Sequence, residues 1–253
     1  MVRPMTILIL LLAGVWAGTQ NALAGGGSFV TFAILLLTGV DARAANITST
    51  IALFPGQVAT GWAVRHNTSG AGSLSFRALV VLSLVGGAIG AMLLLATPAD
   101  FFARLVPWLV LFATGVFAWG SFRRAPAATP VPHRALGPWP AAAAQFAISV
   151  YGGYFGGGIG FLMLAALTVA GQTMRQAGAT KNVLAGAMNA SAMLIFVFSP
   201  EVRWAPVAVL AAGSIVGGQL GAWLLLRTDE RLLRAGVVLI GLALTVGLFL
   251  QAP

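Results

Sequence analysis

The chain has 253 residues, of which 59% are hydrophobic and only 8% are charged, and its mean hydropathy is +0.95. A soluble domain of this size needs far more charge to cover its surface, and the long apolar runs lack the alternation of a membrane β-barrel. The net charge of +9 comes from basic residues that lie almost entirely between apolar runs, where they orient membrane helices rather than bind nucleic acid. The absence of cysteine excludes disulfides and thiolate chemistry. Composition therefore predicts an all-α polytopic membrane protein.

The apolar segments follow one another in two sets of five. The first set covers residues 4–24, 28–39, 44–64, 76–96 and 104–122, and the second covers 139–156, 160–171, 181–198, 205–226 and 232–250. A proline-rich linker at 123–138 cannot continue a helix, so it separates an N-terminal transmembrane repeat (1–122) from a C-terminal one (139–253). The first segment imitates a signal peptide, but its counterpart lies in mid-chain, so we expect it to be retained.

The two sets are copies of one another. A shift of 132 residues aligns 24–50 with 156–182 at nine identical positions of 27, and a shift of 131 aligns 85–95 with 216–226 at eight of 11. If every segment changes side, the basic residues divide four to ten between the two faces, whereas they divide seven to seven if the short segments do not. The positive-inside rule favours the first topology, with both termini outside and the linker in the cytoplasm. The halves are then inverted repeats, an arrangement typical of secondary transporters.

A glycine cluster precedes the short second segment of each half. Segments of about 12 residues give only ~18 Å of helix, too short to span a bilayer alone. We expect Gly86, Gly90, Gly217 and Gly221 to serve helix packing, and a nucleotide loop is excluded because no strand or Walker lysine accompanies the glycines. At the two clusters, packing competes with a broken or re-entrant helix whose first N–H groups bind an anion. The candidates there are Gly25, Gly26, Gly27, Ser28, Gly157, Gly158 and Gly160.

The third segment of each half is rich in uncharged polar groups. Such groups must face protein, water or ligand, and helix capping competes with ligand contact for each of them. The candidates are Asn46, Thr48, Ser49, Thr180, Lys181 and Asn182, with Gln57 and Asn189 as secondary ones. Further secondary candidates are Arg43 and Arg175 in the links before these segments, and Tyr154, which flanks the second glycine cluster and has core packing as its alternative role. We expect Lys181 to lie close to the start of its segment, where snorkelling is its alternative role, and Pro55 to break or kink its helix.

All five acidic residues lie between segments, whereas a cation site or proton relay needs a carboxylate inside the membrane. The sequence therefore favours an anion as substrate. No catalytic constellation or metal-ligand spacing accompanies the polar groups, so we expect neither an enzyme nor a cofactor. The remaining alternatives are an anion channel and a membrane subunit that transports nothing.

The stretches "AGGGSF" and "ARAANITSTIALFPG", with "FGGGIGFLM" and "ATKNVLAGAMNASA" in the second copy, resemble the TauE/SafE family of sulfite and sulfonate exporters. The resemblance covers essentially the whole chain. It implies export of sulfite, sulfoacetate or other organosulfonates across a bacterial inner membrane, and it extends to the glycine and polar candidates named above. A secondary transporter with one midplane anion site and alternating access is the expected mechanism. The expected partners are a small anion and the lipid bilayer, with monomer and homodimer both left open.

Overall fold

The computed structural model describes residues 4–23, 25–122, 137–224, 239, 242–243 and 245–250, and every regular element in these ranges is helical. The first half supplies α1 (Pro4–Leu23), α2 (Gly27–Leu37), α3 (Ala42–Val64), the 3₁₀ turn η1 (Arg65–Asn67), α4 (Phe76–Ala96) and α5 (Ala99–Phe122). The second half supplies α6 (Pro138–Tyr154), α7 (Ile159–Val169), α8 (Met174–Phe196) and α9 (Trp204–Leu224). Nearly all of the predicted linker and most of the segment 232–250 lie outside the described residues.

The first nine predicted segments each coincide with a helix, but two helix starts differ. Helix α5 begins at Ala99 rather than 104, and α8 begins at Met174 rather than 181. Thr173 and Gln176 form a capping box that starts α8 in a polar stretch, which a search for apolar runs overlooks. The expected position of Lys181 is therefore wrong, because this residue lies two turns inside α8. Helix α3 runs through Pro55, so this residue does not break the helix, and the alternative of a kink stays a prediction.

The helices have the length and character of membrane spans. Helices α1, α4 and α9, with residues 99–116 of α5, are each long and apolar enough to cross a bilayer. Helices α3 and α8 are equally long, with 23 residues each, but carry more polar side chains. Large apolar side chains are exposed along the outer helices, as at Leu8, Leu93 and Trp223. The chain is thus an all-α polytopic membrane protein.

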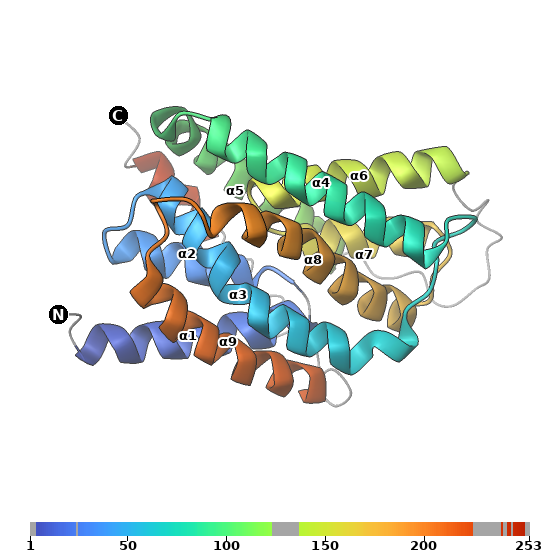
Figure 1. Cartoon of the computed structure of the whole chain (residues 1–253), viewed down its shortest axis with the longest axis horizontal. Coiled ribbons are helices and arrows are strands. Elements are labelled where there is room, and N and C mark those ends of the chain that lie inside the picture. Colours follow the sequence, from blue (N-terminus) through green and yellow to red (C-terminus); the bar gives the residue numbers. More distant parts are fainter. Residues whose placement is uncertain are drawn as a thin grey trace.

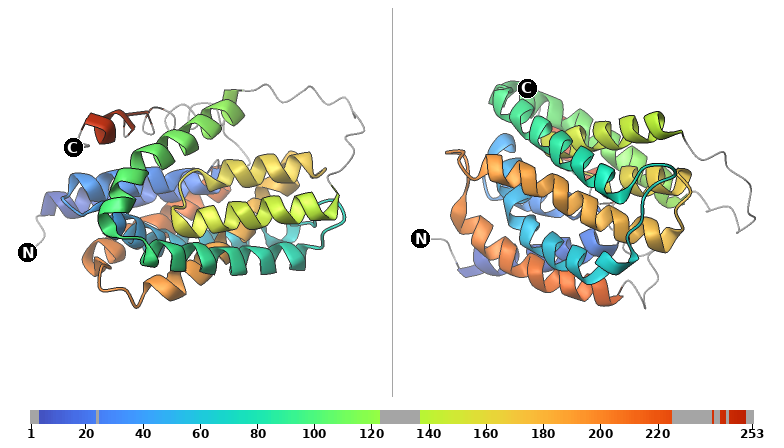
Figure 2. Two further views of the ribbon diagram at one scale, coloured as in Figure 1. Left: turned by 90° about the horizontal axis from the view of Figure 1, so that it is seen from above. Right: turned by 45° about the vertical axis from the view of Figure 1, so that its right-hand side comes forward.

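Helices of the two halves are interleaved rather than separated. Helix α1 packs along α9, and α6 packs along α4, while α3 and α8 lie against each other between these pairs (Figure 1). Figure 2 shows α6 beside α4 from a second direction. Each of these contacts has a counterpart when residues are shifted by the length of the repeat. The boundaries of the two repeats stay predictions.

Glycines allow the outer pairs to pack closely. A Cβ on Gly90 of α4 would overlap the Val150 carbonyl oxygen of α6, and one on Gly217 of α9 would overlap the Val15 carbonyl oxygen of α1. Gly86 and Gly221 face Ser149 and Thr19 in the same way. The predicted packing role of these four glycines is confirmed, because only a residue without Cβ permits such backbone contact.

The links between helices gather at two ends of the bundle. Arg43 bonds to both Thr97 and Glu201 at one end, called here the Arg43 end. Gln172 bonds to Ser69 and Gly70 at the other, called the Ser69 end. This grouping is the one expected when α7 carries the chain back, because Arg43 and Glu201 would otherwise be separated by five long helices and would lie at opposite ends. The inverted relation of the halves, and the membrane side that each end faces, stay predictions.

Candidate functional site

Glycine backbone conformation interrupts the chain at equivalent places in the two halves. Gly26 is the N-cap of α2 with φ 84°, and Gly158 is the N-cap of α7 with φ 74°. Gly25 and Gly156 also have positive φ, at 86° and 76°. An L-residue with a side chain rarely adopts this left-handed conformation, so glycine is required for the sharp turn into each short helix.

The two interruptions touch each other in the interior. A Cβ on Gly25 would lie 2.9 Å from the Cα of Gly160, so the first break packs directly against the start of α7. The Ser28 hydroxyl donates to the Gly156 carbonyl oxygen at 3.2 Å, which ties α2 to the second break. The starts of α2 and α7 therefore meet between α3 and α8.

A cavity lies where the breaks meet, with an empty volume of about 510 Å³ that includes solvent at its opening. Its described lining holds amides, hydroxyls, glycines and one ammonium, and none of these lining residues is acidic. Many of the lining residues occupy equivalent positions of the repeat, because both halves contribute residues to the cavity wall. The equivalent pairs are Ser28 with Gly160, Thr50 with Asn182, Leu53 with Ala185, and Gln57 with Asn189.

Eight of the predicted site residues line this cavity. They are Gly25, Gly26, Ser28, Gly160, Lys181 and Asn182, with the secondary candidates Gln57 and Asn189. Gly27, Gly157 and Gly158 lie at the starts of α2 and α7 but do not line the cavity. Other predicted residues that do not line it are Asn46, Thr48, Ser49, Thr180, Arg43 and Tyr154. The side chain of Arg175 lies outside the described part of the chain.

Sequence reasoning missed six lining residues, namely Asn21, Thr50, Leu53, Gly156, Ile159 and Ala185. The repeat itself could have found Thr50, which is the equivalent of Asn182. Helical spacing then leads to Leu53, three residues on and on the same face as Gln57. Asn21 carries no such signal, because it lies in an ordinary apolar helix.

Lys181 and Asn182 line the cavity and also hold the end of α1. The Lys181 ammonium donates to the Asn21 carbonyl oxygen at 3.3 Å, and Asn182 Nδ2 donates to that of Ala22 at 3.2 Å. Both side chains are buried, at 2% and 7% exposure. The last carbonyls of a helix lack intrahelical partners and carry its negative dipole end, so a cation and an amide are suited to this position.

The break in the second half is held in the same way from the first half. Asn46 Nδ2 of α3 donates to the Tyr154 carbonyl oxygen at the end of α6, at 2.9 Å. Tyr154 is the repeat equivalent of Ala22. Each break is therefore fixed by an asparagine from the third helix of the opposite half, and Asn46 has a capping role here rather than a place on the cavity wall.

The other predicted polar residues tie the links at the two ends. Thr48 Oγ1 accepts from the Arg203 N–H at 3.2 Å, and its equivalent Thr180 accepts from the Ser69 N–H at 3.1 Å. The Ser49 and Thr31 hydroxyls are hydrogen-bonded and buried between α3 and α2. Thr48 and Thr180 thus provide acceptors for backbone N–H groups of the links at the two ends.

Membrane-spanning helices around an internal polar cavity, formed at two interrupted helices, define the class of membrane transport proteins. The family model for the sulfite exporter TauE/SafE matches residues 10–248 of this chain. The chain belongs to the TauE/SafE family.

Three relatives match this chain over nearly the full length of both proteins. The probable membrane transporter protein YfcA of Escherichia coli K12 is 27% identical over 253 residues, which covers 98% of this chain and 91% of that protein. A probable membrane transporter protein of Haemophilus influenzae is 26% identical, with 94% and 92% covered. The probable membrane transporter protein ORF9 of a Sinorhizobium species is also 26% identical, with 96% and 92% covered. The chain is a multi-pass membrane transporter.

Proposed function

We propose that this transporter is a secondary exporter of small sulfur-containing anions across a bacterial inner membrane. Sulfite, sulfoacetate and other organosulfonates are the substrate class, and alternating access around the cavity is the mechanism. The observation that supports the proposal is the meeting of two helix starts and the buried ammonium of Lys181 at a cavity whose described lining has no carboxylate.

An oxyanion matches the donors of this lining. The first N–H groups of a helix lack intrahelical acceptors and lie at the positive end of its dipole, and both α2 and α7 begin at the cavity. The Lys181 ammonium adds a full positive charge, and hydrogen bonds from an ionised donor are about twice as strong as neutral ones. The amides of Gln57, Asn182 and Asn189 supply further donors. The Gly27 N–H already donates to Asn21 Oδ1 at 2.7 Å, so an anion with several oxygens would accept from the other donors.

The apolar part of the lining suits a short carbon chain. Leu53, Ile159 and Ala185 stand beside the polar groups, so an organosulfonate can place its oxygens on the donors and its methylene on these side chains. Pockets commonly combine a few oriented polar groups with an apolar wall in this way. Sulfite, which has no carbon, would use the polar part alone.

The contribution of both halves to one site supports alternating access as the proposed mechanism. A cavity lined by equivalent residues of two repeats lies where one repeat moves against the other, so such motion can expose it to either side. This motion also distinguishes a carrier from a channel, because a carrier binds the ion at a site that is never open to both sides.

The proposal is tested by counterflow in proteoliposomes. Vesicles loaded with unlabelled sulfite or sulfoacetate receive labelled tracer outside, and a carrier accumulates the tracer transiently. Lys181→Met should abolish the accumulation, whereas Arg104→Gln, which removes one charge from an exposed position on α5, should not. Flux without counterflow would indicate an anion channel. Absence of saturable flux over sulfonates, sulfite, sulfate and carboxylates would favour the non-transporting subunit.

A further inference from the structure

One face of α3 connects an ion pair at the Arg43 end with the cavity. Arg43, Asn46, Thr50, Leu53 and Gln57 follow one another in steps of three and four residues, so they form a single stripe along the helix. The last three members line the cavity. One face of α3 therefore holds both the Arg43 ion pair and part of the cavity wall.

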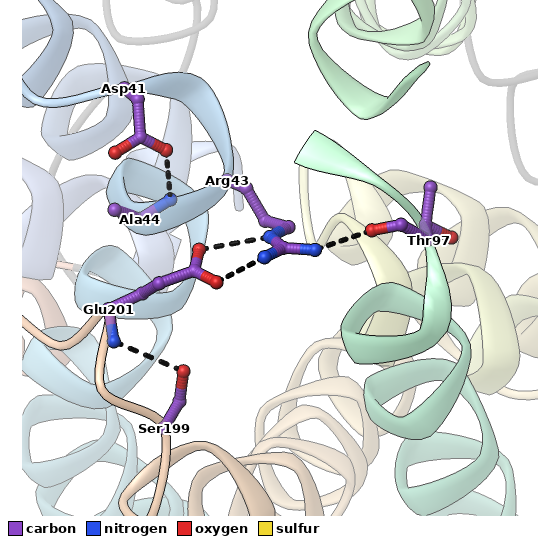
Figure 3. A network of polar contacts seen from close by, with 6 residues as sticks. All are labelled: Asp41, Arg43, Ala44, Thr97, Ser199 and Glu201. Carbon is purple, nitrogen blue, oxygen red and sulfur yellow. Dashed lines mark hydrogen bonds and ion pairs between the residues drawn. The ribbon is translucent and has the colours of Figure 1, made fainter. Parts of the chain in front are cut away.

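The ion pair joins links from both halves. The Arg43 Nε donates to Glu201 Oε2 at 2.9 Å, a second guanidinium nitrogen pairs with Glu201 Oε1, and a third donates to the Thr97 carbonyl oxygen (Figure 3). Glu201 belongs to the α8–α9 link, and Thr97 follows α4. One guanidinium thus holds the start of α3 to segments on either side.

Aromatic side chains pack beside the Thr97 link and the second break. Tyr154 accepts from Asn46 through its carbonyl oxygen, while its hydroxyl approaches Thr97 Oγ1 at 3.4 Å. The rings of Tyr154 and the buried Phe155 pack against Phe102 of α5 at 5.6 and 6.4 Å between centroids. These contacts connect the second break, which lines the cavity, with α5 and with the Thr97 link.

The opposite end has a different chemistry at the equivalent place. Glu201 corresponds by the repeat to Ser69, and there the Gln172 amide donates to the carbonyl oxygens of Ser69 and Gly70 at 2.9 and 3.0 Å. Thr48 and Thr180 make the same link contact at both ends. Among the described side chains, both ends therefore have the threonine hydrogen bond to a link. They differ in that the Arg43 end also has an ion pair.

We propose that the Arg43–Glu201 pair is the gate residue pair that decides to which end the cavity opens; this rests on the alternating-access part of the proposed function. The pair holds the Arg43 end shut and separates when that end opens. Its side chains are 18% and 24% exposed, and ion pairs in contact with water are individually weak and sensitive to salt. A contact of this kind can be broken once in each transport cycle.

The gate is tested by accessibility of the cavity. The natural chain has no cysteine, so Leu53→Cys alone reports on the cavity when a membrane-impermeant maleimide is added to either side of oriented vesicles. Arg43→Gln and Glu201→Gln should each raise the labelling rate from the Arg43 end about fivefold, which corresponds to about 1 kcal/mol at 1.4 kcal/mol per factor of ten. The exchange Arg43→Glu with Glu201→Arg should return the rate toward that of Leu53→Cys alone.

Matched controls separate the gate from general loosening. Arg104→Gln removes a charge from an exposed site on α5 and should leave labelling unchanged. Higher ionic strength should speed labelling of the natural pair but not of Arg43→Gln. Unchanged labelling in both single variants, or a charge exchange that labels as fast as they do, would overturn the gate. Because labelling requires no substrate, failure of sulfonate transport with a positive labelling result would refute the proposed substrate and leave the gate standing.

Discussion

Gln57 accepts a hydrogen bond from Asn189 Nδ2 at 2.7 Å, and these two residues occupy equivalent positions of the repeat. Helices α3 and α8 are equivalent, pack against each other and run in opposite directions between the Arg43 and Ser69 ends. In such a pair a residue meets its own equivalent only at the axis that relates the helices. The Gln57–Asn189 bond lies in the cavity wall, and the predicted inverted repeat would place it at the axis that relates the two halves.

Removal of the Gln57–Asn189 bond should weaken substrate affinity more than it lowers the stability of the helix bundle. Gln57→Ala and Asn189→Ala should each weaken substrate affinity. The double variant should lose less than the sum, because the two changes remove one shared interaction. The stability cost of the bond is about 0.5–1.5 kcal/mol, to be measured by thermal unfolding in detergent beside transport KM. Thr168→Ala, which removes a hydroxyl bonded within its own helix, is the control. Strictly additive effects on KM would contradict a shared role.

Substitutions of Lys181 should separate its charge from its hydrogen bond. Lys181→Gln keeps a donor for the Asn21 carbonyl oxygen but removes the charge, so we expect weaker anion transport with thermal stability close to that of the natural protein. Lys181→Met removes both and should also lower stability by about 1 kcal/mol. Lys181→Arg should retain the most transport. Unchanged KM in Lys181→Gln would remove the ammonium from the substrate site.

Gly26→Ala should impair transport beyond its effect on stability. An alanine at φ 84° costs about 1–2 kcal/mol, and it would disturb the turn that forms the cavity wall. Gly39 has φ 85°, has open space around it and does not line the cavity. Gly39→Ala therefore introduces the same backbone strain without changing the cavity wall. Flux normalised to folded protein should fall only in Gly26→Ala. Equal normalised flux in the two variants would show that the first break serves folding alone.

Gly90→Ala should destabilise the bundle, whereas Gly115→Ala should not. A Cβ at position 90 would overlap the Val150 carbonyl oxygen, so α4 and α6 would have to separate. A Cβ at position 115 meets nothing within 4 Å, and alanine is the better helix former. Comparison of the two melting temperatures in detergent checks the expectation. A fall of similar size in both variants would contradict the packing role of Gly90.

The sequence predicted much of the fold because lipid imposes simple local rules. Apolar runs fixed α1, α4 and α9 to within a few residues, and the glycine clusters marked both breaks, because a left-handed turn requires glycine wherever it occurs. The repeat also predicted that corresponding residues have corresponding surroundings, as found for Thr48 and Thr180. The start of α8 was not predicted, since its capping box lies in a polar stretch and hydropathy detects only apolar residues.

The place of each polar side chain was decided by tertiary structure. Asn46 and Asn182 have the same type and similar settings in the sequence, yet only Asn182 lines the cavity. Both cap a helix more than 100 residues away. Arg43 was a candidate ligand and is instead paired with Glu201, 158 residues distant. Lipid and backbone sterics act on each segment locally and are legible in the sequence, whereas these partners are chosen by how the helices of two halves pack, which no local pattern encodes.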